Sequence, residues 1–164
     1  MLTNPSSDKA HILIAQGVNL DLLGTREPEI YGSDTLATIE AMVRQASPDI
    51  ARLFGWSAPE LCFFQSNHES LFLEKLSEGW SGALINPGAW THTSLALADR
   101  LAALRLPFVE VHLSNLSRRE SFRQHSYASP HALGVCYGFG ATSYLSALTG
   151  LYAYLAKTLQ SKGL

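Results

Sequence analysis

The sequence predicts an α/β fold with a five-stranded parallel sheet, and three observations support this prediction. Short apolar runs occur five times along the chain, each of a length that suits a buried strand. Segments with helical periodicity lie between these runs, so strands and helices alternate. The chain has 164 residues, of which 46% are hydrophobic and 16% are charged, so it can bury a substantial core in one domain.

The expected strands are these five apolar runs in chain order. They lie near residues 11–15, 60–65, 82–86, 107–112 and 132–137. Strands joined through helices need right-handed crossovers, which make the sheet parallel and cover both of its faces. The simplest solution is the flavodoxin-like order 2-1-3-4-5, a three-layer sandwich that takes residues 1–164 as a single domain. Residues 1–10 are expected to form a disordered or loosely attached tail.

The expected helices lie at residues 35–46, 69–79, 93–104 and about 140–160. Ser47 followed by Pro48 is typical of a cap and a first helical residue, and predicts a continuation to about residue 54. Thr91 or Thr93 is expected to cap the third helix. The apolar stripes of the first three helices are Leu36, Ile39 and Val43, then Leu71, Phe72 and Leu76, then Leu97, Leu101 and Leu104. The last helix is apolar over much of its circumference, which predicts a contact with another subunit.

Charge and composition exclude several functional classes. A formal net charge of −2 argues against non-specific nucleic-acid binding, because that binding needs a basic face. The first ten residues lack the apolar run of a secretory signal, and no stretch reaches the ~20 apolar residues of a membrane span. We therefore expect a cytoplasmic protein with small-molecule partners or copies of itself. Cys62 and Cys136 lack C-x-x-C spacing and are expected to be small, reduced, buried residues.

Polar residues collect directly after the expected strands. After the first four strands come QGVNLDLLGTREPEIYG, QSNHES, NPGAWTHTS and HLSNLSRRESFRQHS. The carboxyl ends of parallel strands meet at one edge of a sheet, where open α/β folds bind their ligands. Four such loops converging on one edge predict a ligand site there.

The segment 24–32, GTREPEIYG, contains a candidate proton acceptor. Pro28 and the flanking glycines make this segment a loop, so Arg26 and Tyr31 can approach each other. A tyrosine pKa near ~10 must fall by roughly two to three units to be useful at neutral pH, which corresponds to ~3 to 4 kcal/mol. A cation about 4 Å away supplies on the order of 4 kcal/mol in a partly screened site.

Two other loops offer an acid and an anion site. In NPGAWTHTS, Asn86 and His92 are free to face the cleft, and the alternative is a turn whose side chains serve only its own backbone. His112 ends a strand whose apolar residues are broken only by Glu110, and it is either a proton donor or a satisfied core histidine. The backbone N–H groups of Leu113 and Ser114 follow it and suit an anion such as a carboxylate.

The remaining candidates are more ambiguous. Arg118, Arg119 and Arg123 are either solvated or hold an anionic substrate. Glu69 either orients His112 or caps its own helix. The glycine turn GFGATS, at 138–143, either accepts a phosphate of a nucleotide or flavin or serves close packing. The histidines lack zinc-site spacing, so no metal is expected.

The loop sequences together resemble type II 3-dehydroquinate dehydratase. The strings that carry the resemblance are NLDLLGTREPEIYG, FFQSNHE, INPGAWTHTS, VEVHLSN, FRQHSY and GVCYGFGA, in the family's order and spacing. The resemblance covers nearly all of the chain from His11 to about Tyr154. It implies a hydro-lyase of the shikimate pathway for aromatic amino acid biosynthesis. The reaction is the trans-dehydration of 3-dehydroquinate to 3-dehydroshikimate through an enolate, without metal or organic cofactor.

The resemblance also implies a role for each site residue. Tyr31 corresponds to the base, Arg26 to the group that stabilises its anion, and His112 to the acid. Asn86 corresponds to the residue that holds a water against the enolate and contacts the substrate. Further substrate contacts are implied for Asn19, His92, Asp99, Leu113, Ser114 and Arg123, with Glu69 and Arg119 behind them. Asp99 matches a residue donated by a neighbouring subunit, which implies a homo-oligomer, commonly a dodecamer of trimers.

The chain departs from the family pattern at four positions. Gln16, Val18 and Asp21 stand where Asn, Pro and Asn are frequent, and Trp90 stands for a common Tyr. None of them replaces a proposed proton-transfer residue. The alternative is a flavodoxin-like binding or scaffold protein that kept the fold and lost the reaction.

Overall fold

A five-stranded parallel sheet forms the centre of the computed structural model, which describes residues 9–25 and 34–161, with side chains as far as residue 158. Its strands are β1 (His11–Gln16), β2 (Glu60–Gln65), β3 (Gly82–Asn86), β4 (Phe108–His112) and β5 (Gly134–Tyr137). Their order is β2-β1-β3-β4-β5, and every neighbouring pair is parallel. The predicted fold class and strand order are confirmed. Residues 1–8 of the predicted tail 1–10, together with Arg26 and Tyr31, lie outside the described residues.

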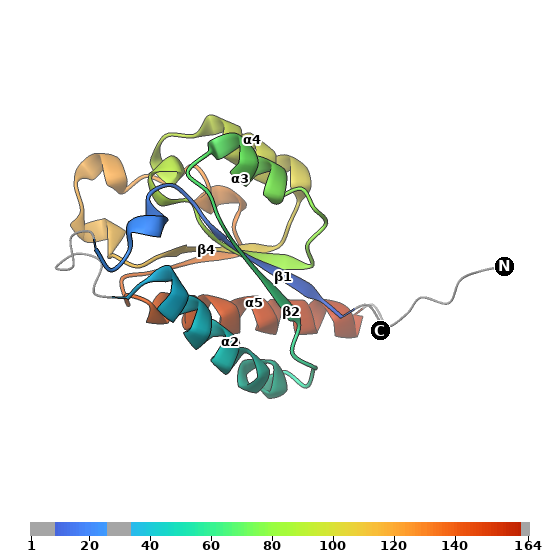
Figure 1. Cartoon of the computed structure of the whole chain (residues 1–164). Coiled ribbons are helices and arrows are strands. Elements are labelled where there is room, and N and C mark those ends of the chain that lie inside the picture. Colours follow the sequence, from blue (N-terminus) through green and yellow to red (C-terminus); the bar gives the residue numbers. More distant parts are fainter. Residues whose placement is uncertain (1–8, 26–33, 162–164) are drawn as a thin grey trace.

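Helices cover both faces of the sheet. In Figure 1, α2 (Leu36–Leu53) and α5 (Thr142–Ser161) lie on one face, and α3 (Glu69–Lys75) and α4 (Leu95–Leu104) lie on the other. Alternate residues of a strand point to opposite faces, so β1 contributes to two cores. Ile12 and Ile14 pack in the core under α2 and α5, whereas Leu13 and Ala15 pack in the core under α3 and α4.

Helix α2 is continuous through its proline, which corrects the prediction of a break at Ser47. The helix begins with a capping box between Thr35 and Thr38 and runs from Leu36 to Leu53 with Pro48 inside it. Proline costs a helix about 3 kcal/mol or more in its interior. Burial of the flanking turns offsets that cost, since Ile39, Val43 and Ala51 are fully buried. The Ser47 hydroxyl lies 2.7 Å from that of Tyr152 on α5, so it links two helices instead of capping one.

The helices on the other face are shorter than predicted. Helix α3 ends at Lys75 instead of residue 79, and Leu71 of its expected stripe is 49% exposed. Helix α4 begins at Leu95, and its cap is Ser94, whose hydroxyl accepts from the Leu97 N–H at 2.9 Å. The caps predicted at Thr91 and Thr93 are therefore wrong. Residues 88–92 instead form a 3₁₀ helix that precedes α4.

One face of helix α5 is buried within its own chain. It packs against α2, β3, β4 and β5, and Tyr144, Leu148, Leu151 and Tyr152 are fully buried. Among the described side chains of α5, the large apolar residue that remains exposed is Tyr154, at 42%. The apolar circumference is thus explained mainly by the sheet and α2. Within the described ranges, no helix is long and apolar enough to cross a membrane.

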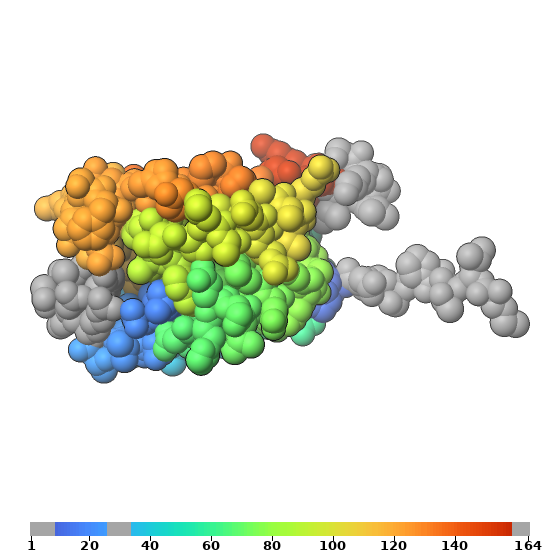
Figure 2. All heavy atoms as spheres, turned by 90° about the horizontal axis from the view of Figure 1, so that it is seen from above, coloured from blue at the N-terminus to red at the C-terminus, as the bar shows by residue number. Residues whose placement is uncertain are grey.

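The loops that follow the strands gather at one end of the molecule. In Figures 1 and 2, the segment after β1, coloured blue, and the segment after β4, coloured orange, lie at the same end, away from the start of β1. The loops after β1 and β3 touch through their main chains, and the Gly17 N–H donates to the Asn86 carbonyl at 2.7 Å. A Cβ atom on Gly17 would collide with the Pro87 carbonyl. One on Gly88, which has φ of 62°, would lie 2.7 Å from the Val18 oxygen. Only glycine permits this approach.

Candidate active site

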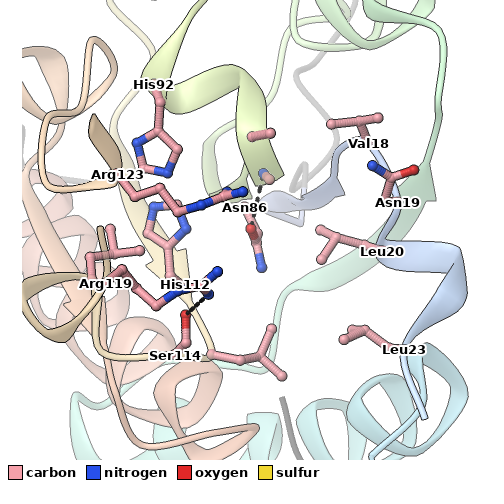
Figure 3. A pocket seen from close by; sticks show the side chains of 14 residues that line it. Val18, Asn19, Leu20, Leu23, Asn86, His92, His112, Ser114, Arg119 and Arg123 are labelled. Carbon is pink, nitrogen blue, oxygen red and sulfur yellow. Dashed lines mark hydrogen bonds between the residues drawn. The ribbon is translucent and has the colours of Figure 1, made fainter. Parts of the chain in front are cut away.

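A cleft opens at the carboxyl ends of β1, β3 and β4, and its two walls differ in chemistry. Figure 3 shows His92, His112, Arg119 and Arg123 on one side, which we call the cationic wall. Val18, Leu20 and Leu23 lie on the other side and form the apolar wall. Asn86 lies between the walls. The other lining residues are Asn19, Gly88, Ala89, Leu113, Ser114 and Leu116.

The Asn86 carboxamide is held from two directions. It is only 2% exposed, and its Oδ1 accepts from the Gly88 N–H at 3.2 Å. Its Nδ2 donates to the Tyr144 hydroxyl at 2.9 Å. A carboxamide has two donor hydrogens and two acceptor lone pairs. These bonds leave one hydrogen and one lone pair for the cleft, enough to bind a water and a substrate group.

His112 is paired with a buried carboxylate from its own strand. Residues two apart on a strand point to the same face, and the Glu110 Oε1 lies 2.7 Å from the His112 Nε2. The Glu110 side chain is fully buried, and that of His112 is 7% exposed. The carboxylate accepts the Nε2 hydrogen, which leaves Nδ1 as the ring nitrogen that Glu110 does not engage. A histidine held in this way can carry a second proton and give it up.

Two hydroxyls complete the environment of Glu110. Thr91 donates to Oε1 at 2.5 Å, and Ser126 lies 3.0 Å from Oε1 and 2.9 Å from Oε2. Burial alone raises the pKa of the Glu110 carboxyl. The hydrogen bond and charge of His112, together with the two hydroxyls, outweigh that effect and lower its pKa below the ordinary value. Glu110 is therefore a buried anion that accepts hydrogen bonds from His112, Thr91 and Ser126.

We expect Glu110→Gln to lower the free energy of unfolding at pH 7 by about 1–3 kcal/mol, because a charge-assisted network loses its anion. The folded pKa of Glu110 is depressed, so its stabilisation is complete above the unfolded pKa of about 4.3 and is lost as the pH falls through the folded pKa. Urea unfolding of parent and variant at pH 7 and pH 3.5 should show the difference shrinking at the lower pH.

The matched control for this prediction is Glu40→Gln. Glu40 pairs with Arg44 one helical turn away, and its side chain is 40% exposed. Exposed pairs of this kind are worth about 0.3–0.5 kcal/mol, so this variant should differ little from the parent. A stability difference for Glu110→Gln that is the same at both pH values would contradict the assignment of a depressed pKa.

His92 is fixed beside His112. Its Nδ1 lies 2.7 Å from the His125 carbonyl oxygen, and its ring stacks on that of His112 with centroids 6.4 Å apart. Burial is the largest effect on its pKa and lowers it, and the charges of His112 and Arg123 lower it further. The carbonyl accepts the Nδ1 hydrogen from a neutral ring. His92 therefore presents Nε2 as a neutral hydrogen-bonding atom.

The two arginines reach the cleft from 3₁₀ turns after β4. Those turns are Leu116–Arg118 and Ser121–Arg123, so the segment is not the regular helix on which the two would share a face. Arg119 Nη1 lies 3.4 Å from the Ser114 hydroxyl. Arg123 Nε lies 3.3 Å from Glu120 Oε2 but makes no hydrogen bond with it among the described residues. The cationic wall therefore attracts an anion at the end of β4.

The segment after β1 is anchored to the segment after β2. Asn19 has a left-handed backbone with φ of 63°, and its N–H donates to the Asn67 Oδ1 at 2.7 Å. Asn67 Nδ2 donates to the Asp21 carboxylate at 3.0 Å. The Asp21 carboxylate therefore has a hydrogen-bond partner in Asn67. Asn19 is held at the rim of the cleft by this anchor.

Some predicted site residues lie elsewhere. Asp99 is exposed on α4 and is not part of the cleft lining. Glu69 is the first residue of α3, and one of its carboxylate oxygens is buried without a hydrogen-bond partner among the described residues. The carboxylate that contacts His112 is Glu110 instead. Sequence reasoning missed Glu110, although a charged residue two positions before a histidine in a buried strand is the signal that could have found it.

The glycine turn before α5 uses its backbone donors internally. The Phe139 N–H donates to the Ser143 hydroxyl at 3.1 Å, and the Gly140 N–H donates to the Leu113 carbonyl at 3.0 Å. Gly138 and Gly140 have φ of 93° and 58°. These bonds agree with close packing of this turn against the loop after β4, and they occupy donors that a phosphate would need.

Comparison with known proteins gives consistent matches. The model of the family described as dehydroquinase class II matches residues 10–152. A 3-dehydroquinate dehydratase of Dinoroseobacter shibae is 49% identical over 148 residues, covering 88% of this chain and 94% of the relative. One from Nostoc sp. is also 49% identical over 148 residues, covering 88% and 95%.

Solved structures agree with this assignment. The type II dehydroquinase of Butyrivibrio crossotus is 34% identical, with a TM-score of 0.79 and coverage of 87% of this chain and 97% of that one. The type II dehydroquinase of Propionibacterium acnes is also 34% identical, with a TM-score of 0.75 and coverage of 93% and 99%. The chain therefore belongs to the class II dehydroquinase family.

Proposed function

We propose that this chain is a type II 3-dehydroquinate dehydratase, which removes water from 3-dehydroquinate to give 3-dehydroshikimate. The observation that carries the proposal is the His112–Glu110 pair, which faces a cleft also lined by Asn86 and two arginines. An acid, an amide and a cationic wall suit a substrate that has a carboxylate, several hydroxyls and a leaving hydroxyl. The reaction places the chain in the shikimate pathway, a cytoplasmic route to aromatic amino acids.

The first step is removal of a proton from the carbon next to the ketone. Tyr31 is the proposed base, and the Arg26 guanidinium lowers its pKa by favouring the phenolate. The electrons of the broken C–H bond move onto the ketone oxygen, which gives an enolate. Both residues belong to the stretch that the resemblance matches most distinctively, although they lie outside the described residues.

The second step expels the hydroxyl group as water. A proton on His112 Nδ1 is transferred to the departing oxygen while the enolate electrons form the carbon–carbon double bond. Glu110 accepts the Nε2 hydrogen at 2.7 Å and thereby holds the ring with Nδ1 away from the carboxylate. The proton taken by Tyr31 and the hydroxyl that leaves together account for the water lost.

The remaining residues bind the substrate and its developing charge. The unused hydrogen and lone pair of Asn86 hold a water against the enolate oxygen. The backbone N–H groups of Leu113 and Ser114 bind the carboxylate, and Arg119 stands behind Ser114. His92 and Arg123 contact the ring hydroxyls of the substrate. Asn19 contacts the substrate from the rim of the cleft.

A neighbouring subunit completes the site in this proposal. Asp99 lies on the exposed face of α4 and outside the cleft of its own chain, as a residue donated to another copy must be. We therefore propose a homo-oligomer, a dodecamer of trimers, in which each cleft receives Asp99 from a neighbour.

The direct test is to mix the purified protein with 3-dehydroquinate and follow the rise of conjugated enone absorbance. We expect steady turnover that borohydride does not abolish, because an enolate route forms no imine with a lysine. Inactivation by borohydride in the presence of substrate would refute the enolate route. No turnover at all would favour the alternative of a non-catalytic binding protein.

A further inference from the structure

A buried tyrosine lies directly behind the Asn86 carboxamide. Tyr144 of α5 is fully buried, and its hydroxyl lies between two amides that come from the ends of neighbouring strands. It accepts from Asn86 Nδ2 at 2.9 Å and donates to Gln16 Oε1 at 2.5 Å. Tyr144 is absent from the cleft lining, so it reaches a bound molecule only through Asn86.

The direction of each hydrogen bond in the series Asn86–Tyr144–Gln16 follows from one backbone group. The Gly88 N–H is a donor only, so the atom of Asn86 that faces it must be the oxygen, Oδ1. Nδ2 then faces Tyr144 and donates, so the phenol oxygen accepts. The phenol hydrogen is left for Gln16, whose oxygen must face it. The chain Asn86 to Tyr144 to Gln16 therefore has one consistent arrangement.

The Tyr144 hydroxyl keeps its proton. Burial raises the pKa of Tyr144 well above its ordinary value, and this effect is larger than the opposite influence of the Asn86 and Gln16 bonds. A protonated phenol supplies both an acceptor and a donor, as the two amides require. Rotating the Asn86 amide by a half turn would set two donors against each other at the Gly88 N–H and two acceptors against each other at the Tyr144 oxygen. Both losses occur in a buried setting, where unpaired polar groups are costly.

Gln16 supplies the acceptor for the Tyr144 hydroxyl. It is 3% exposed at the end of β1, and its side chain carries Oε1 to that hydroxyl. The backbone of Gln16 is fixed independently, because its carbonyl accepts from the Ser66 N–H at 3.1 Å. Its amide therefore has a rigid base from which to orient the phenol.

We propose that Tyr144 is a positioning residue that fixes the orientation of the Asn86 carboxamide, with Gln16 setting the direction of the Tyr144 hydroxyl. This inference rests on the proposed function, in which Asn86 holds the water that stabilises the enolate. The fixed orientation decides which hydrogen and which lone pair of Asn86 face the cleft. Stabilisation of developing charge depends on donors that are already oriented when the charge forms.

The test is Tyr144→Phe, which removes the hydroxyl and keeps the ring. We expect kcat on 3-dehydroquinate to fall roughly tenfold while KM changes by less than about twofold, because the orientation of Asn86 matters most in the transition state. In an Asn86→Ala background the same change should alter kcat by less than about twofold, since Tyr144 then has no amide to orient. Independent, multiplicative losses in the double variant would overturn the inference.

The matched control is Tyr152→Phe, two turns further along α5. Tyr152 is also fully buried, and its hydroxyl bonds one side chain, that of Ser47 at 2.7 Å, whereas that of Tyr144 bonds two. Its ring packs on Trp56, on the α2 side of the core. Both variants should lose thermal stability, but only Tyr144→Phe should lose kcat. Equal losses of kcat would show that Tyr144 acts only through general stability and would overturn the proposal.

If Tyr144→Phe does not fold, Gln16→Met decides the question. Methionine keeps the length of the side chain and removes the acceptor, so kcat should fall at least about threefold with KM nearly unchanged. An unchanged kcat in this variant would overturn the proposal. If the parent protein turns over 3-dehydroquinate and the variants are equally active, the proposed function stands and only the role of Tyr144 is overturned. If the parent protein shows no turnover, both the proposed function and the role of Tyr144 are overturned.

Discussion

We expect the replacement of His112 with asparagine to lower kcat by about 10²–10⁴-fold and to leave KM within a few-fold of the parent value. General acids contribute rate factors of that size, and asparagine offers no proton of suitable acidity to the departing hydroxyl. The effect falls on kcat because the transferred proton matters in the transition state more than in the bound ground state. Steady-state kinetics with 3-dehydroquinate provide the measurement.

The His112 prediction has a control in the same chain. His131 is exposed and ends the 3₁₀ helix Ser129–His131, away from the cleft lining. His131→Asn should keep the parent kcat. Substantial activity in His112→Asn would mean that another group protonates the leaving oxygen and that the Glu110 pair serves only stability.

Tyr31→Phe should reduce kcat by a similar or larger factor, because phenylalanine cannot accept the proton from carbon. The two variants are distinguished by the step that fails. In heavy water, the His112→Asn variant should still exchange the substrate hydrogen next to the ketone for deuterium, because the enolate forms and is protonated again by the base. The Tyr31→Phe variant should not catalyse this exchange. Proton NMR of the substrate, incubated with each variant, measures this exchange.

The control for the tyrosine is Tyr154→Phe. Tyr154 is 42% exposed on α5 and lies outside the cleft lining, so its loss should leave both kcat and exchange unchanged. Exchange at the parent rate in Tyr31→Phe would remove Tyr31 from the role of base. It would also redirect the search for that base to the described walls of the cleft.

Local pattern predicted the sheet well because buried strands need short apolar runs, and each of the five runs became a strand. The errors came where distant partners decide local structure. Pro48 was expected to begin a helix, but packing against α5 carries α2 through it. Thr91 was expected to cap α4, but its hydroxyl bonds Glu110, nineteen residues away.

In the candidate site, the residues at strand ends were predicted and the buried residues behind them were not. Asn86, His92 and His112 were predicted because polar residues at strand ends are conspicuous in a sequence. Glu110 and Tyr144, which hydrogen-bond to His112 and Asn86, were not predicted, because they resemble ordinary members of a strand and a helix until the fold brings their partners close. The roles of Arg26 and Tyr31 remain predictions from the sequence.

The main-chain contact between the loops after β1 and β3 limits how relatives of this protein can diverge in ligand preference. Neither Gly17 nor Gly88 has room for a methyl group, so the separation of these two loops is set by peptide groups alone. Evolution cannot widen or narrow this part of the cleft by exchanging single side chains there. Selectivity among homologues should therefore vary through residues of the apolar and cationic walls.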